Sequence, residues 1–381
     1  MAAGLSFAVA TPSQATYPNH NGRIAFQAEV GKHIQLFTMS PSGHNMRQLT
    51  HGVGDSTRPD WSPNGRLIAF EFDLPVGGCH VRLLRLSTGR IVDLTQDKDV
   101  CEQAPAFTPS GKRIIFVRFD GDIEAMWSMN LAGGDRHRIR VAGEQLAAPA
   151  VSPDGTTLSF VAYNGKDLGQ ALETVPLDGS GGGITRLMPY RSNIAIKQDW
   201  APNGRHLVFT KNADRPDRPA NIFTIRPNGT GLHRLTHSRS PELRFNVGGY
   251  SPNGHWIVYR KTSFPTGATI TAETLEQGLK GQFSVYRMHP DGSGKQRILG
   301  PSTFLPRYLD WGPATISMTR PVDGVPTAVD AGLADGSAAA TPSTDPTPSS
   351  TALRLVGATT GLTLVSAGAV SLLRRRRRDT A

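Results

Sequence analysis

PDWSPNGRLIAF, residues Pro59–Phe70, is a stretch that the chain repeats with small changes. In each copy a short segment leads into a turn of Pro, a small polar residue and Gly, and a mostly apolar segment follows. Proline presets φ for the second position of a type I turn, Asn or Asp suits the third, and Gly takes the left-handed position that ends the turn. Each copy therefore predicts a strand, a tight turn and a second strand. The other copies are PAFTPSGKRIIF (Pro105–Phe116), PAVSPDGTTLSF (Pro149–Phe160), QDWAPNGRHLVF (Gln198–Phe209) and GGYSPNGHWIVY (Gly248–Tyr259).

A second motif, again a strand, a Gly turn and a strand, lies between these copies, so that one repeat holds four strands. The glycine of the first motif recurs in steps of 46, 44, 49 and 50 residues. A four-stranded repeat of this period is typical of a propeller blade. The second motif occurs at Phe37–Thr50, Leu84–Thr95, Met129–Arg140, Val175–Leu187, Thr224–Thr236 and Arg287–Leu299.

The two ends of the repeat array complement each other. The first repeat begins at Asn21–Phe26 with no strand before it, and Arg307–Pro313 supplies a leading strand with little repeat after it. We expect Arg307–Trp311 to pair with the N-terminal blade and Ala314–Met318 to add a second strand to that seam. The predicted fold is all-β: a six-bladed β-propeller of four-stranded blades over residues 17–320, closed without free edges.

The repeat, Pro-x-Trp-Ser-Pro-Asn-Gly-x-x-Ile-Ala-Phe with a later Gly-x-x-x-x-Leu-Thr, resembles the WD40-like repeat of TolB-type propellers. The resemblance covers roughly Asn21–Met318. It implies a propeller fold, and it is compatible with several functions, because related propellers serve as periplasmic binding platforms, as gating domains of prolyl oligopeptidases and in some lyases. Too few residues precede Asn21 for the N-terminal α/β domain of TolB, so we do not expect a direct role in the Tol system.

The segments outside the repeats predict export and a membrane anchor. Residues 1–16 resemble the back half of a secretory signal, with small residues at Ser13 and Ala15. Residues 321–352, rich in Ala, Ser, Thr and Pro, predict a disordered linker. Residues 353–381 then hold Leu355–Leu373, which has no charge and at about 1.5 Å per residue just spans a bilayer core of roughly 30 Å. The basic tail Arg374–Arg378 places that end in the cytoplasm and the propeller outside. A cell-wall sorting signal is the alternative interpretation, although Gly357–Gly361 lacks its usual Leu-Pro.

Composition excludes some partners. The 381 residues carry a net charge of +10, of which the C-terminal arginines supply five, and no basic stripe with interleaved aromatic residues appears. We therefore expect no nucleic-acid partner. Cys79 and Cys101 are too few for a zinc site and too far apart for a redox pair. We predict that they form a disulfide between neighbouring blades if the protein is exported.

Sequence motifs of catalysis are missing. The chain has no Gly-x-Ser-x-Gly elbow, His-Glu-x-x-His pair, Walker loop or EF-hand loop, and we expect no cofactor and no metal. The glycine run Gly179–Gly183 falls at a hairpin of the repeat. The recurrent pairs Asp60-Trp61, Asp199-Trp200 and Asp310-Trp311 predict structural roles, with the indole between blades and the carboxylate bonded to nearby backbone or hydroxyl groups.

Two features are candidates for binding. The residues expected just before each inner strand are polar, and a ring of them suits an anionic ligand. Residues 262–281 form an insertion in the sixth blade that is longer than an ordinary connection, and we expect it to contact a partner. The candidate rim residues are Arg58, Gln103, Gln145, Lys197, Arg244 and Arg307.

Two functions remain open at this stage. The first is a non-enzymatic module that binds a protein or glycan at the cell surface. The second is a hydrolase or lyase that acts on polysaccharide or peptide at the channel mouth. An enzyme should bring carboxylates, His or Tyr together at one rim, whereas the rim residues named above are mostly Arg, Lys and Gln, so we favour the binding module.

Overall fold

The Ser-Pro-Asn-Gly turn is closed by its own side chains. In the computed structural model the Ser62 hydroxyl donates to Asn64 Oδ1 at 2.9 Å and accepts the Leu67 N–H at 2.9 Å. Gly65 has φ of +68°, which an L side chain rarely adopts. Because these bonds satisfy the polar groups at the corner, the turn fixes the register of the two strands that it joins. The same bonds recur around Ser152 and Ser251.

The structure describes residues 20–315 except 76–77, 122, 140, 142–144, 165–168, 178–182 and 278–280. These residues form antiparallel sheets, which we name A to E in chain order. Sheet A has the order β24 (Arg307–Pro313), β1 (Asn21–Val30), β2 (His33–Met39), β3 (Arg47–Gln48). Sheet B contains β4 (Asp55–Trp61), β5 (Leu67–Asp73), β6 (Cys79–Arg85), β7 (Ile91–Asp93), β8 (Cys101–Phe107), β9 (Arg113–Asp120), β10 (Ile123–Asn130) and β11 (His137–Ile139).

The remaining sheets follow the same four-stranded plan. Sheet C contains β12 (Gln145–Val151), β13 (Thr157–Asn164), β14 (Gly169–Pro176) and β15 (Thr185–Met188). Sheet D contains β16 (Ile194–Trp200), β17 (Leu207–Lys211), β18 (Asn221–Ile225) and β19 (His233–Arg234). Sheet E contains β20 (Leu243–Tyr250), β21 (Ile257–Ser263), β22 (Gln282–Met288) and β23 (Gln296–Ser302). The described helices are the 3₁₀ turn η1 (Tyr190–Ser192) and α1 (Ala272–Gln277).

The prediction of six separate blades is wrong, whereas the all-β propeller is confirmed. The described residues form four separate four-stranded sheets and the eight-stranded sheet B. Within sheet B, β4–β7 and β8–β11 each repeat the plan of the other sheets, and one parallel residue pair, Cys79 with Cys101, joins them. The predicted disulfide forms between these two residues, whose Cα atoms lie 4.4 Å apart. This covalent bond holds β6 and β8 close enough to pair, and so merges two sets of strands into one sheet.

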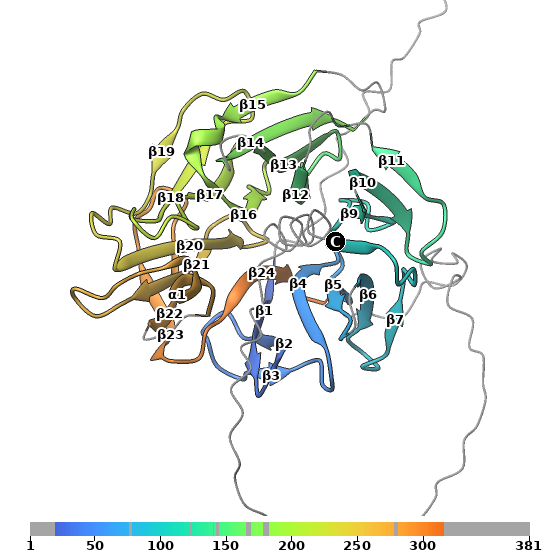
Figure 1. Ribbon diagram of the computed structural model, residues 1–381, viewed down its shortest axis with the longest axis horizontal. Coiled ribbons are helices and arrows are strands. Elements are labelled where there is room, and N and C mark those ends of the chain that lie inside the picture. Colours follow the sequence, from blue (N-terminus) through green and yellow to red (C-terminus); the bar gives the residue numbers. More distant parts are fainter. Residues whose placement is uncertain are drawn as a thin grey trace, which may run out of the picture. The chain divides into compact units, whose positions relative to one another are not determined.

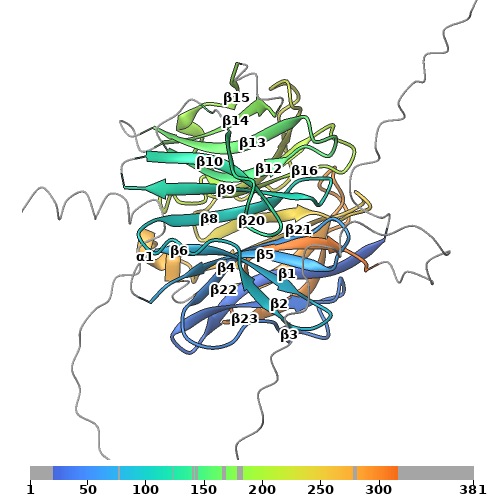
Figure 2. The same ribbon diagram turned by 90° about the vertical axis from the view of Figure 1, so that its right-hand side faces the viewer.

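The sheets stand around a common centre (Figure 1). The innermost strands contact one another in the order β24, β4, β8, β12, β16 and β20, and β20 contacts β24 again. In the view turned by 90°, β8, β9 and β10 of sheet B run side by side (Figure 2). A closed ring of this kind leaves no innermost strand with an open flank.

The seam between the two ends of the repeat array forms as expected. Strand β24 pairs antiparallel with β1, although the two strands are about 280 residues apart in sequence. The Ala314 N–H donates to the His20 carbonyl at 3.0 Å and extends the seam by one bond. The further strand expected at Ala314–Met318 does not form at Ala314 and Thr315, and its other residues lie outside the described part. The paired residues are Asn21 with Pro313, Ile24 with Trp311, Ala25 with Asp310, and Gln27 with Arg307.

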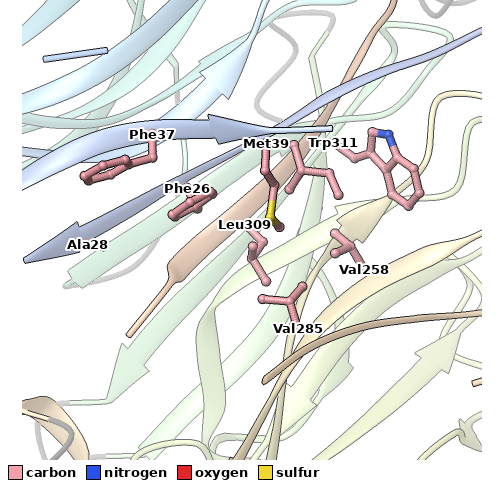
Figure 3. Packing of buried hydrophobic residues seen from close by; sticks show 9 residues of the cluster. Phe26, Ala28, Phe37, Met39, Val258, Val285, Leu309 and Trp311 are labelled. Carbon is pink, nitrogen blue, oxygen red and sulfur yellow. The ribbon is translucent and has the colours of Figure 1, made fainter. Parts of the chain in front are cut away.

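A hydrophobic cluster packs the seam from both sides (Figure 3). Leu309 and Trp311 of β24 are 2% and 3% exposed, and they lie beside Met39 of sheet A. Val258 and Val285 of sheet E complete the cluster. The seam strand is therefore packed against two sheets at once, and burying this apolar area stabilises the closure.

The aspartates of the Asp-Trp pairs bond neighbouring innermost strands to each other at three places. Asp310 Oδ2 accepts the Trp61 N–H at 2.9 Å, and Asp199 Oδ2 accepts the Tyr250 N–H at 2.7 Å. Asp60 Oδ2 likewise accepts the Phe107 N–H at 2.7 Å between the two halves of sheet B. The predicted structural role of these aspartates is confirmed, because each satisfies a backbone donor of the following innermost strand.

The predicted terminal segments 1–16, 321–352 and 353–381 lie outside the described residues. The chain divides into a unit of residues 1–332, to which the described residues belong, and a unit of residues 333–381. Within the described ranges, neither helix has the length and apolar character that a membrane crossing requires.

Candidate functional site

The innermost strands define two faces of the ring. We call the side on which these strands begin the leading face, and the side of the Ser-Pro-Asn-Gly turns the trailing face. The strand pairing places Glu71 and Asp73 of β5 beside the first residues of β4, so that both lie toward the leading face. Polar and charged side chains from several sheets meet there, and we take this end of the channel as the candidate site.

Several innermost strands contain a β-bulge, an irregularity at which the pairing with the second strand shifts by a residue or more. The register shifts between Thr57 and Asp60, and Arg58 has φ of +49°. A non-glycine residue with positive φ is uncommon and needs support from its surroundings. That support comes from the preceding sheet, because the Arg58 N–H donates to Gln27 Oε1 at 2.7 Å. Ala104, Ala148 and Tyr308 have the same conformation in their strands.

Among the predicted rim residues, Arg58 contacts charged and polar side chains of the leading face. Its Nη1 lies 2.6 Å from Glu71 Oε2 and 3.0 Å from Gln103 Oε1. The guanidinium also faces the Tyr308 ring, with the centroid 5.7 Å from Cζ. Burial by itself would lower the pKa of Arg58, but Glu71 and Tyr308 raise the pKa above its usual value. Arg58 is therefore a permanent, fixed cation of the channel wall.

The structure separates the other predicted rim residues. Gln103 is a partner of Arg58, and Lys197 lies toward the trailing face, with Nζ 3.2 Å from Asp310 Oδ1. Arg244 is only 2% exposed, and it donates to the carbonyls of Asn212, Ala213 and Arg218. The side chain of Gln145 lies outside the described part. Arg307 begins β24, within electrostatic reach of Arg260.

Lys197 is enclosed by carboxylates. Burial lowers the pKa of Lys197, and the charges of Asp310, Asp199 and Asp60 outweigh burial and raise it. Burial in turn raises the pKa of Asp199 to about 7 in spite of Lys197. The aspartates also bind backbone N–H groups, so this cluster joins the sheets and we do not count it as a binding site.

Sequence reasoning missed the charged residues of the second strands. Glu71, Asp73 and Arg260 stand on β5 and β21, whereas only residues of the innermost strands were considered. Their signal in the sequence is a charge directly after an aromatic residue, as in Phe70-Glu71 and Tyr259-Arg260. The insertion at 262–281, predicted to contact a partner, contains α1. The Phe264 N–H donates to the Glu242 carbonyl, which puts the insertion on the leading face.

The pKa values of two acids of the leading face are raised toward neutral pH and above. Burial, together with the neighbouring Glu71 carboxylate, raises the pKa of Asp73 to about 8. Burial raises the pKa of Glu124 to about 7, although the Leu146 N–H and Arg58 oppose the rise. One proton between Glu71 and Asp73 lets the two carboxyl groups share a hydrogen bond rather than repel each other.

We predict that the protein loses stability as the pH rises from about 5 to 8. A carboxyl group whose pKa is raised in the folded state binds a proton that the unfolded chain has already lost, so folding is favoured at lower pH. Each retained proton changes the unfolding free energy by about 1.4 kcal/mol per pH unit in this window. Urea unfolding at pH 5.5, 7.0 and 8.5 measures how steeply the unfolding free energy falls with pH. Asp73→Asn should make this fall less steep. A wild-type stability that rises over this range would contradict the assignment.

Glu71, Asp73 and Cys79 place potential metal-ligating atoms within 4.8 Å of one another. The sulfur of Cys79 is bonded to Cys101, so it is not available as a thiolate ligand. The remaining two carboxyl groups, of Glu71 and Asp73, are bonded to each other and interact with the positive charge of Arg58. We therefore do not interpret this group as a metal site.

Comparison with known proteins agrees with the fold. The profile of the TolB β-propeller domain matches residues 6–181. An uncharacterised protein of Agrobacterium fabrum is 30% identical over 141 residues, which cover 34% of this chain and 47% of that protein. The Tol-Pal system protein TolB of Francisella tularensis subsp. holarctica is 26% identical over 244 residues, 62% of this chain and 52% of that protein. The chain thus spans about half the length of these curated relatives.

Solved structures show the same architecture. The crystal structure of TolB from Acinetobacter baumannii superimposes with a TM-score of 0.60 at 19% identity, over 77% of this chain and 67% of that chain. At this identity the likeness concerns the fold alone. The sequence motif, the profile match and the superposition agree with one another, and the repeats of this chain are TolB-type β-propeller repeats.

Proposed function

We propose that this chain is an exported, membrane-anchored module that binds a protein partner at the cell surface and performs no chemistry of its own. The observation that supports this most is the leading face, where fixed cations are held on a ring bonded from sheet to sheet. Arg58 is supported there by Glu71, Gln103 and Tyr308. A preorganised charged surface loses little freedom when it binds, which favours recognition. A glycan is the other partner class that this surface would suit.

The location outside the cell is part of the proposal. The disulfide between Cys79 and Cys101 supports it, because such bonds persist in oxidising compartments. The anchor at residues 355–373 and the signal at residues 1–16 rest on their sequences alone. Protease shaving of intact cells, followed by fractionation, tests the location: release of the propeller from the membrane fraction is the expected result, and full protection of the propeller would contradict outward display.

A screen of the full-length protein against peptide and glycan arrays, with turnover measured for every ligand found, tests the function. We expect saturable binding without loss of ligand. The control is Arg113→Gln, because Arg113 begins β9 directly after a turn of the trailing face and pairs there with Asp135. Binding should survive in the control and weaken when Arg58 is changed to Gln. Turnover that a single substitution on the leading face abolishes would reject the binding module.

The alternative function, a hydrolase or lyase acting on polysaccharide or peptide, has one observation in its favour. The pKa of Glu124, raised by burial to about 7, lies where a general acid or base works best. Its carboxyl group is engaged with the Leu146 N–H, and the described residues bring no nucleophile into contact with it. Turnover in the array screen that disappears in Glu124→Gln would establish this alternative.

A further inference from the structure

An acceptor oxygen from the second strand of one sheet recurs at the bulge of the next innermost strand. Gln27 Oε1 accepts the Arg58 N–H at 2.7 Å between sheets A and B. Glu71 Oε2 accepts the Ala104 N–H at 3.1 Å within sheet B, and Thr210 Oγ1 accepts the Val247 N–H at 2.9 Å between sheets D and E. All three acceptors follow the aromatic residue of the repeat directly, as in Phe26-Gln27 and Phe70-Glu71.

Arg260 occupies the corresponding position between sheets E and A. It follows Tyr259 on β21, and the bulge residue of the next innermost strand is Tyr308, with φ of +50°. A guanidinium donates hydrogen bonds and accepts none. Arg260 instead donates from Nη1 to the Pro306 carbonyl and from Nη2 to Asn246 Oδ1, each at 3.2 Å. At this interface the repeat therefore places a cationic donor where three other copies place an oxygen and the remaining two place Val117 and Val161.

The charge of Arg260 is not balanced locally. Among the described residues, no carboxylate lies within ion-pair distance of Arg260, and its Nε is buried without a hydrogen-bond partner. Burial, together with the charges of Arg307 and Arg244, lowers the pKa of Arg260 to about 9. A buried, uncompensated cation is costly, and an anion that reaches it recovers that free energy.

We propose that the wall of the channel between β21 and β24 binds a carboxylate of the protein partner through Arg260 and Arg307. The bound group is an acidic side chain or the C-terminal carboxylate of a peptide. One oxygen of this carboxylate accepts the Tyr308 N–H, as Gln27, Glu71 and Thr210 accept the bulge N–H groups of three other innermost strands. The second oxygen faces the Arg260 guanidinium. The Nε–H of Arg260, which has no partner among the described residues, donates a charge-assisted hydrogen bond to that second oxygen. The inference rests on the proposed function, because it names the chemistry by which the partner is recognised.

The surroundings of Arg260 favour a peptide over an acidic sugar. The guanidinium lies over the ring of Phe283, with its Cζ 6.0 Å from the ring centroid. The methylene groups of a Glu side chain pack well against an aromatic face, whereas the hydroxyl groups of a uronic acid would lose their water there without new partners.

Binding of a fluorescent hexaglutamate peptide to the full-length protein tests the proposal by anisotropy. A hexaglutamine peptide of the same length and an oligomer of galacturonic acid are the comparison ligands. Arg260→Gln removes the cation, and Arg260→Lys keeps the charge but loses the planar fork. Arg287→Gln is the matched control, because Arg287 lies on the neighbouring strand β22, stacked on Trp256 at 4.4 Å. A thermal melt of each variant confirms that it is folded.

We expect hexaglutamate to bind the wild type and Arg287→Gln alike, and to bind Arg260→Gln about 10- to 100-fold more weakly. Hexaglutamine should bind none of these proteins. The affinity of Arg260→Lys for hexaglutamate should lie between that of the wild type and that of Arg260→Gln. If Arg260→Gln does not fold, Arg260→Lys carries the comparison. Equal binding of hexaglutamate by all variants would overturn the site and leave the binding function standing. Selective binding of the galacturonic acid oligomer would overturn the peptide as ligand, and binding of neither anion would overturn the inference.

Discussion

Replacing Trp311 by Ala is expected to lower the unfolding free energy by about 3–5 kcal/mol, the range seen when a buried Trp is truncated. Trp311 is 3% exposed, and its Nε1 donates to the Gly22 carbonyl at 3.2 Å. It belongs to the strand that closes the ring, and its cluster reaches into sheet E through Val258. The truncation therefore removes contacts on both sides of the seam at once.

Denaturation of the variant in guanidinium chloride measures the loss, and hydrogen exchange locates it. Amides of β1 and β24 should exchange faster than amides of sheet C, because the seam opens first when its packing is weakened. Trp127→Ala is the control, since Trp127 is only partly buried at the edge of another cluster. A loss no larger than that of the control would show that Trp311 does not hold the ring closed.

Replacing Arg58 by Ala is expected to cost about 3–5 kcal/mol, because it leaves the Glu71 carboxylate buried without its cation. The Glu71 side chain is 4% exposed, and the Ala104 N–H and the Asp73 carboxyl group, both without positive charge, would be its remaining partners. The loss of charge compensation matters more than the lost contact. Adding Glu71→Gln to Arg58→Ala should therefore recover much of the stability.

A double-mutant cycle over Arg58 and Glu71 isolates this coupling, which we expect to be about 2 kcal/mol or more. The matched control is Arg215→Ala, because the pair of Arg215 with Asp217 is exposed and pairs of that kind contribute about 1 kcal/mol or less. Additive losses in the cycle would mean that Arg58 contributes by packing alone and that the leading face carries no preorganised charge.

The parts of the fold that depend on local chemistry could be predicted from the sequence. Ser62, Asn64 and Gly65 make a turn from their own atoms, so their order in the chain is sufficient to indicate it. The seam was predictable because the incomplete repeats at the two ends complement each other. The merging of two sets of strands into sheet B depends on how closely Cys79 approaches Cys101, and no local pattern encodes that distance.

The candidate site was only partly predictable, because the pairing register between innermost and second strands decides which residues face the channel. Arg58 and Lys197 occupy the bulge position that faces the channel, whereas Arg244 lies three residues before the corresponding Val247 and is buried. Counting back from each motif assumes that every innermost strand begins at the same depth, and the bulges break that assumption. Glu71 and Arg260 were missed because only the pairing of second strands with innermost strands brings them to the channel.

The closure of sheet A also means that the polypeptide enters and leaves the ring at the same place, with the His20 carbonyl bonded to the Ala314 amide. Tethers at either end would thus pull on one sheet and leave the others unloaded. A circular permutant that joins these ends and is cut in the connection between β3 and β4 would build sheet A from contiguous chain. Its folding would then no longer depend on two distant segments finding each other.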